Sequence, residues 1–157
     1  MKRERDAKTG QKMINQYLIL QEIGRGVHGK VKLAFDTELN DFVAIKVVRK
    51  KQAKGLKLGT ALAGGGTTDK IKKEIAIMKK CIHPHVVRLF EVIDDPKAEK
   101  IYMVLEYLDG GDLPWQEGHQ SSVVPVEVMK SIFRDLILGV EYRKYYLYHD
   151  FPLIFII

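Results

Sequence analysis

The chain has 157 residues, of which 46% are apolar and 29% are charged, and its 26 Lys and Arg against 20 Asp and Glu give a net charge of +6. This composition suits one globular domain and excludes a wholly disordered chain. The single cysteine, Cys81, excludes a disulfide framework and a cysteine-based zinc site. Residues 1–12 do not resemble a secretory signal, and no apolar run is long enough to cross a bilayer, so we expect a cytoplasmic protein without a membrane partner.

The first half of the chain predicts a polar tail followed by three strands. Residues 1–16 are polar and are expected to form the tail. Residues 17–23 are an apolar run, residues 31–35 alternate between apolar and other side chains, and residues 42–48 are rich in β-branched side chains. A polar turn at residues 38–41 joins the last two, so we expect an antiparallel meander.

An insert and a helix come next. Residues 52–69 hold five of the 13 glycines and predict a flexible loop that is long for a compact domain. Apolar residues then recur at helical spacing, with lysines on the other face, and Pro84 follows the expected end of the helix. The predicted apolar positions are Ile71, Ile75, Met78 and Ile82.

The remaining elements are two strands and a second helix. Residues 86–93 and 101–107 predict strands joined by a charged turn, and residues 126–142 predict an amphipathic helix. We therefore expect an α+β fold: a five-stranded antiparallel sheet with one packed helix, followed by the start of a helical region. The apolar face of the second helix would be exposed unless something covers it. It consists of Met129, Ile132, Phe133, Leu136, Ile137 and Val140.

A glycine motif lies between the first two predicted strands. The pattern GxGxxGxV is typical of loops that bind phosphates, because backbone N–H groups approach phosphate oxygens closely where no side chain intervenes. A strand, not a helix, is predicted after it, which favours a β-hairpin over a dinucleotide-binding turn. His28 is expected at the tip of the turn as an exposed residue without a catalytic role. The motif residues are Gly24, Arg25, Gly26, Val27, His28, Gly29, Lys30 and Val31.

Lys46 is the candidate cation for the phosphates. Strand alternation places Ala44 and Lys46 on one face of the third predicted strand, where a small side chain leaves room for a flat base. Glu74 is the one acidic residue among the lysines of the first helix, and it flanks the apolar face. We expect an ion pair between Lys46 and Glu74 that positions the lysine; a surface pairing of Glu74 within its own helix is the alternative.

These motifs, in this order, resemble the protein kinase family over residues 17–142. The segments VAIK, HPHVVRL and YMVLEYLDGGDL add to the glycine loop. The resemblance implies ATP as substrate, Lys46 and Glu74 as a positioning pair, and Leu105 as the residue at the back of the pocket. It also implies that the adenine meets Ile23, Val31, Ala44 and the backbone of Glu106 and Leu108, with Tyr107 between these two and Asp112 near the ribose.

Within the family, the chain is most similar to the calcium/calmodulin-dependent kinase kinases and their fungal relatives. The resemblance rests on EIAIMKK, EVIDDP and the insert between Lys46 and Glu74, although this insert lacks the proline of the animal proteins. It implies a protein substrate, an AMP-activated-type kinase. Residues 17–108 would form the N-terminal lobe with its hinge, and residues 109–142 the start of the C-terminal lobe.

Residues 143–157 depart from the family pattern. They form an apolar tail in which His149 and Asp150 lack the surroundings of an HRD motif, and the DFG and APE motifs are absent from the 157 residues. Without the base Asp and the residues that bind Mg²⁺ in the family, we expect the chain to be inactive alone. The alternatives are a truncated serine/threonine kinase and a non-catalytic nucleotide-binding or protein-interaction module. Nucleic-acid binding would rest on net charge alone, and we expect none.

Overall fold

The structure is a computed structural model that describes residues 1–7, 9–26, 29–50, 67–111 and 124–146. The chain divides into two compact units. One consists of Met1–Lys80 and Leu89–Tyr107, and the other of Cys81–Arg88 and Leu108–Ile157.

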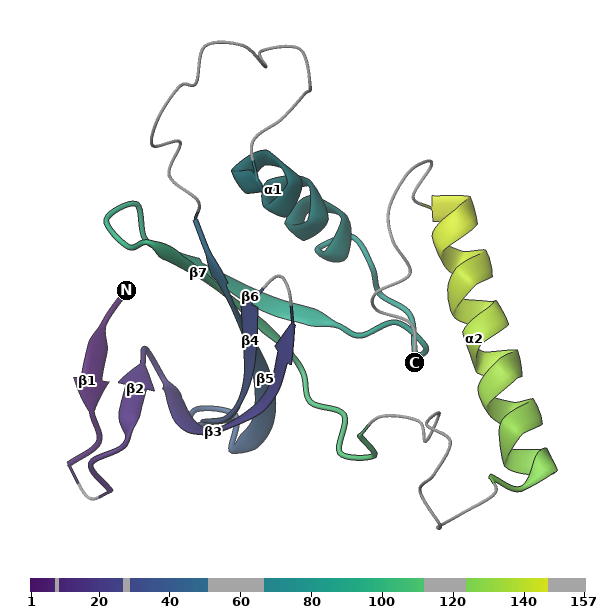
Figure 1. Cartoon of the computed structure of the whole chain (residues 1–157), viewed down its shortest axis with the longest axis horizontal. Coiled ribbons are helices and arrows are strands. Elements are labelled where there is room, and N and C mark those ends of the chain that lie inside the picture. Colours follow the sequence, from purple (N-terminus) through teal and green to yellow (C-terminus); the bar gives the residue numbers. More distant parts are fainter. Residues whose placement is uncertain (8, 27–28, 51–66, 112–123, 147–157) are drawn as a thin grey trace. The chain divides into compact units, whose positions relative to one another are not determined.

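The first unit is built on one antiparallel sheet, shown in Figure 1. Its seven strands follow the order β1-β2-β3-β4-β5-β7-β6, so consecutive strands are neighbours except where β7 lies between β5 and β6. The predicted α+β class with an antiparallel sheet and a helix is confirmed. The strands are β1 (Arg3–Arg5), β2 (Lys12–Ile14), β3 (Tyr17–Gly26), β4 (Gly29–Asp36), β5 (Asp41–Arg49), β6 (Leu89–Asp94) and β7 (Lys100–Glu106).

The sheet has two strands more than expected, because the segment predicted as a polar tail forms the hairpin β1–β2. The hairpin pairs Arg3 with Ile14 and Arg5 with Lys12, and Gly10 takes a φ of +68° in the turn between them. Strand β1 contains no apolar residue, and each strand has only three residues, so no alternation of apolar side chains could be recognised. Ile14 nevertheless joins the core, with 2% of its surface exposed.

The two faces of the sheet carry different side chains. Residues directly opposite each other in antiparallel strands point to the same face. Ile45 pairs with Val104 and Val47 with Tyr102, and these residues belong to the apolar core. Ala44 and Lys46 alternate with them on β5 and therefore point to the other face. The core consists of Ile14, Tyr17, Ile19, Ala34, Val43, Ile45, Ile93, Tyr102 and Val104, with Val47 packed against it.

A hydrogen bond from the buried Tyr17 joins two distant strands of the curved sheet around this core. The hydroxyl of Tyr17 on β3 donates a hydrogen bond of 2.7 Å to Oε2 of Glu91 on β6, although three strands lie between β3 and β6 in the sheet. Burial, with the hydrogen bond to Glu91, raises the pKa of Tyr17. The contact shows that the sheet bends until its β6 edge reaches β3.

Helix α1 (Thr67–Met78) belongs to the same unit. Ile71 and Met78 on its apolar face are each 6% exposed, as the helical spacing predicts. The prediction for Ile82 is wrong: the helix ends at Met78, and Ile82 is 72% exposed. The chain then turns at Pro84, where the N–H of Val86 donates to the carbonyl of His83.

The second unit contains α2 (Val126–Tyr146), which is one turn longer than the predicted helix and takes in the start of the segment expected as a divergent tail. The segment Cys81–Arg88 contacts it: the N–H of Ile82 donates to the Tyr142 hydroxyl at 3.1 Å, and the rings of His83 and Tyr142 stack. Four of the six residues predicted for the apolar face of α2 are exposed, with Phe133 at 61%, whereas Ile132 and Leu136 are half-buried. Neither α1 nor α2 is long and apolar enough to cross a membrane.

Candidate functional site

The ion pair predicted from the sequence is present in the first unit. Nζ of Lys46 on β5 donates to Oε1 of Glu74 on α1 at 3.1 Å. The side chains are 12% and 29% exposed, so the pair is sheltered but open to solvent on one side. Since Lys46 points away from the apolar core, α1 covers the face of the sheet opposite that core. This arrangement fixes the ammonium group of Lys46 above the sheet.

The register of the strands places the glycine motif in line with Lys46. Gly24 on β3 pairs with Val31 on β4, Val31 pairs with Lys46 on β5, and Lys46 pairs with Met103 on β7. These four residues form one row across the sheet, on the face that α1 covers. The motif and the lysine are therefore neighbours although 22 residues separate Gly24 from Lys46 in the sequence.

A second row on the same face supplies an apolar floor. Ala44 pairs with Leu33 on one side and with Leu105 on the other. Ala44 is 7% exposed and Leu105 is 5% exposed. Ile23, at the end of the apolar run of β3, is 41% exposed. A floor of small and aliphatic side chains beside an ammonium group suits a ligand that is flat and apolar at one end and anionic at the other.

The described glycines of the motif fall into two kinds. Gly29 has a φ of +147°, and a Cβ atom there would collide with the backbone carbonyl of Val47. At Gly24 an added Cβ would make only ordinary contact with Val31, and at Gly26 it would meet nothing within 4 Å. The fold therefore requires glycine at Gly29, but it does not require glycine at Gly24 or Gly26.

Glu22 holds the hairpin of β3 and β4 together. Arg25 and Lys30 lie directly opposite each other, and like charges in such positions repel. The carboxylate of Glu22 accepts 2.8 Å and 2.9 Å hydrogen bonds from Arg25 Nε and Lys30 Nζ. These two bonds lower the pKa of Glu22. Glu22 thus compensates part of the positive charge of the motif within the hairpin.

The other predicted site residues lie at the end of β7 or outside the described part of the chain. Val27, His28 and Asp112 lie outside the described residues, as do the insert at 51–66 and residues 147–157 with His149 and Asp150. Glu106 is the last residue of β7 and is exposed, and Tyr107 follows it half-buried. Leu108 begins a segment of the second unit.

Sequence reasoning missed two residues of the site. Met103, fully buried beside Lys46, lies two positions before Leu105, so strand periodicity could have placed it on the same face. Glu22 lies two residues before Gly24 and is followed by the cations Arg25 and Lys30. One acid close to two cations of the same hairpin could have indicated an ion pair.

Comparison with known proteins gives a consistent result. The model of the protein kinase domain matches residues 17–150. The chain is 49% identical over 140 residues to the serine/threonine-protein kinase ssp1 of Schizosaccharomyces pombe, covering 89% of this chain and 21% of that protein. It is 42% identical over 149 residues to SNF1-activating kinase 1 of Saccharomyces cerevisiae, covering 89% of this chain and 13% of the relative. A Caenorhabditis elegans calcium/calmodulin-dependent protein kinase kinase is 33% identical over 145 residues, covering 84% of this chain and 26% of that kinase.

Proposed function

The chain belongs to the protein kinase family, and from that membership we propose that it forms the ATP-binding part of a serine/threonine protein kinase. The observation that carries the proposal is the ion pair of Lys46 with Glu74 at 3.1 Å, in line with the glycine motif. A lysine held by a helix glutamate is the group that protein kinases use to position the phosphates of ATP.

We assign each end of the nucleotide to one part of the site. The phosphates lie between Lys46 and the backbone of the glycine hairpin, where Gly24 and Gly26 leave the N–H groups accessible. The adenine lies on the floor formed by Ala44 and Leu105.

The remaining contacts of the nucleotide come from the family resemblance. We propose that Ile23 and Val31 cover the base, that the backbone of Glu106 and Leu108 bonds the adenine on either side of Tyr107, and that Asp112 contacts the ribose. Arg25, Val27, His28, Gly29 and Lys30 complete the loop over the phosphates.

The whole protein's reaction and substrate are also proposals, because the chain spans only 21% and 13% of the length of the first two relatives. We propose transfer of the ATP γ-phosphate to a Ser or Thr hydroxyl of a protein. The substrate that the resemblance supports is an AMP-activated-type kinase, in keeping with the name SNF1-activating kinase. Among the described residues, no group of three or more His, Cys, Asp or Glu fits a metal ion.

ATP binding to the 157-residue chain tests the proposal directly. We expect saturable binding in isothermal titration calorimetry, and we expect Lys46→Met to weaken it about tenfold or more, because the ammonium–phosphate interaction is lost. Glu74→Gln should weaken it less, since the ammonium group remains but is no longer held. Lys72→Met, an exposed lysine of α1, is the matched control. Equal affinity for wild type and Lys46→Met would contradict the proposed site.

A non-catalytic interaction module is the second candidate function. The exposed apolar face of α2, with Phe133 at 61% and Met129 and Ile137 at 49%, favours it, because such a face is typical of a surface that another element covers. We expect the 157-residue chain to bind ATP without transferring its phosphate. A phosphotransfer assay with radiolabelled ATP separates the two: incorporation that Lys46→Met abolishes would show catalysis by these residues.

A further inference from the structure

Five cationic side chains from four strands lie on the core side of the sheet, two of them on its edge strand β1. In the β1–β2 hairpin, Arg5 and Lys12 are directly opposite each other, and Arg3 lies two residues from Arg5 on the same face. Lys32 pairs with Ile45 and Lys100 lies two residues before Tyr102, so both share the face of the apolar core. The basic cluster is Arg3, Arg5, Lys12, Lys32 and Lys100.

No carboxylate neutralises this cluster in the described part of the chain. None of the five side chains takes part in an ion pair there. Burial, followed by the charges of Arg3, Lys100, Lys32 and Arg5, lowers the pKa of Lys12. The four cations are therefore near enough to Lys12 for their repulsion to act on it.

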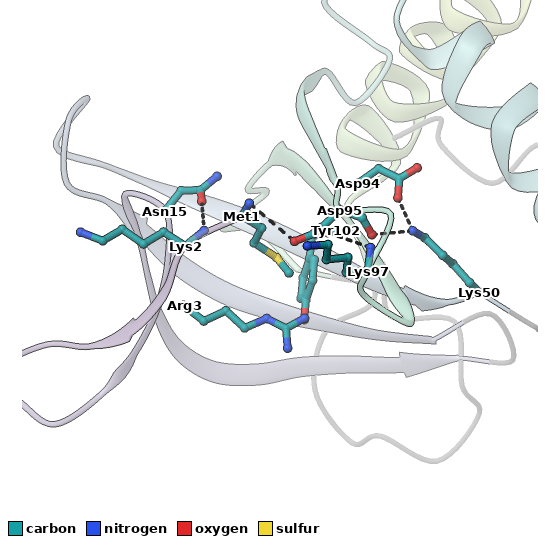
Figure 2. Close-up of polar contacts among 9 residues, drawn as sticks. All are labelled: Met1, Lys2, Arg3, Asn15, Lys50, Asp94, Asp95, Lys97 and Tyr102. Carbon is teal, nitrogen blue, oxygen red and sulfur yellow. Dashed lines mark hydrogen bonds and ion pairs between the residues drawn. The ribbon is translucent and has the colours of Figure 1, made fainter.

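The nearby acidic side chains are engaged elsewhere. Asp95, which lines a small pocket together with Arg3, pairs with the amino group of Met1 at 3.7 Å. Glu22, directly opposite Lys32, pairs instead with Arg25 and Lys30. Glu4 alternates with Arg3 and Arg5 on β1 and pairs with Lys2 at 2.8 Å. Asp94 in the β6–β7 hairpin forms an ion pair with Lys50, and Figure 2 shows this pair apart from Arg3. The guanidinium group of Arg3 instead donates to the hydroxyl of Tyr102 at 3.3 Å. Its remaining donors are available to another acceptor.

Strand β1 also offers backbone groups at the edge of the sheet. The N–H of Asn15 bonds to the carbonyl of Lys2, and the N–H of Asp6 bonds to the carbonyl of Gln11. Since hydrogen-bonded pairs alternate along an antiparallel ladder, Arg3 and Arg5 turn their own N–H and C=O groups away from β2. Among the strands of the described residues, none lies on that side of β1. An extended peptide could therefore pair with the strand.

We propose that the basic cluster and the β1 edge form a docking surface for an extended, acidic segment of a partner protein. The segment adds a strand beside β1, and carboxylates at every second position face Arg3 and Arg5, whose guanidinium groups suit carboxylates in a forked geometry. A lipid bilayer is disfavoured because β1 and β2 contribute no exposed large apolar side chain for insertion. A nucleic acid is disfavoured because Tyr102, the aromatic beside Arg3, is 3% exposed and cannot stack on a base.

Binding of labelled peptides to the full 157-residue chain tests this proposal. The probe is a fluorescein-labelled peptide that alternates Asp and Thr, and its control has the same composition with all Asp residues contiguous. We expect the alternating peptide to bind at least about fivefold more tightly, because its carboxylates lie on one face of a strand. N-methylation of alternate amides, which blocks strand pairing and keeps the charge, should weaken binding similarly. Equal binding of the three peptides would overturn the proposal.

Two double variants distinguish binding at this surface from a general effect of net charge. The double variant Arg3→Gln/Arg5→Gln should weaken binding about tenfold, whereas Lys72→Gln/Lys73→Gln on α1, which removes the same charge, should leave it within about twofold. An equal loss in both double variants overturns the proposal, as does binding of phosphatidylserine vesicles or of a single-stranded oligonucleotide in preference to the alternating peptide.

Lys12→Gln distinguishes a binding role from a structural one. Because Lys12 is repelled by its neighbours, this variant should lower peptide affinity and raise the thermal midpoint of the free protein together. A lower midpoint with unchanged affinity would assign the lysine to folding alone and would count against the docking surface.

Discussion

The two N-terminal hairpins of the sheet are both rich in cations, but only one of them contains a carboxylate that pairs with its facing cations. In the β3–β4 hairpin, Arg25 and Lys30 face each other, and Glu22 accepts a hydrogen bond from each. In the β1–β2 hairpin, Arg5 and Lys12 face each other, and no acid in the described part of the chain forms an ion pair with either.

The number of charges alone therefore does not reveal what a basic surface does. Where a carboxylate is built in, the cations hold a loop in shape, and we propose that this loop presents its backbone to the phosphates of ATP. Where none is present, the fold tolerates repulsion, and an external anion can relieve it. The net charge of +6 does not distinguish the compensated cations of the β3–β4 hairpin from the uncompensated cations of the β1–β2 hairpin.

The largest effect is expected when the backbone of the β3–β4 hairpin is broken at Gly29. Gly29→Ala forces a side chain into a φ of +147° and against the Val47 carbonyl, so we expect a loss of more than about 2 kcal/mol in the free energy of unfolding. Gly26→Ala is the matched control, since its Cβ meets nothing within 4 Å, and it should change stability by less than about 0.5 kcal/mol. Urea denaturation measures both.

The same two variants also test whether the loop binds the phosphates of ATP. Gly26→Ala should keep the fold and weaken ATP binding, because its methyl group stands where a phosphate would approach the backbone. If Gly29→Ala is as stable as wild type, the hairpin geometry described above is wrong. If Gly26→Ala leaves the ATP affinity unchanged, the phosphates do not lie against that residue.

A smaller effect is expected when the compensation by Glu22 is removed. The hydrogen bonds from Arg25 and Lys30 lower the pKa of Glu22 below its usual 4.5. A lowered carboxyl pKa contributes stability that is present above the unfolded pKa and is lost as the pH falls through the folded pKa. Glu22→Gln should therefore flatten the fall of the thermal midpoint between about pH 5 and pH 2, and Glu38→Gln, in the β4–β5 turn, should not. An unchanged acid slope in Glu22→Gln would show that the carboxylate does not hold the hairpin.

The sequence was sufficient where one side-chain pattern determines one element. Alternation and β-branched residues predicted β4 and β5, and helical spacing predicted α1 from Ile71 to Met78. It was insufficient for β1 and β2, since three-residue strands that contain mostly cations carry no periodic signal. Such strands form because Ile14 reaches the core and the neighbouring strand supplies hydrogen bonds, and both causes are non-local.

The candidate site likewise contains features that the sequence could predict and features that depend on the fold. The Lys46–Glu74 pair could be predicted because the two residue types stand out from their surroundings, Glu74 among lysines and Lys46 in an apolar strand. The sequence could not predict that the fold requires glycine at Gly29 but not at Gly26. This difference depends on how closely β5 approaches each glycine of the hairpin. The role of Glu22 likewise depends on the register that places Arg25 opposite Lys30.

The smallest effect is expected at Lys12, and its sign is opposite to that at Glu22. Burial and the neighbouring cations lower the pKa of Lys12 below 10.5, so the unfolded chain binds its proton more tightly than the folded one. The charged lysine then destabilises the fold at neutral pH, and the penalty is lifted as the pH rises through the folded pKa toward 10.5. Lys12→Gln should raise stability at pH 7 by on the order of a few tenths of a kcal/mol, because solvent screens an exposed group. Thermal unfolding between about pH 7 and pH 10 measures the slope, which Lys12→Gln should reduce and Lys72→Gln should not; a less stable Lys12→Gln variant would show that the cations of the β1–β2 hairpin are compensated after all.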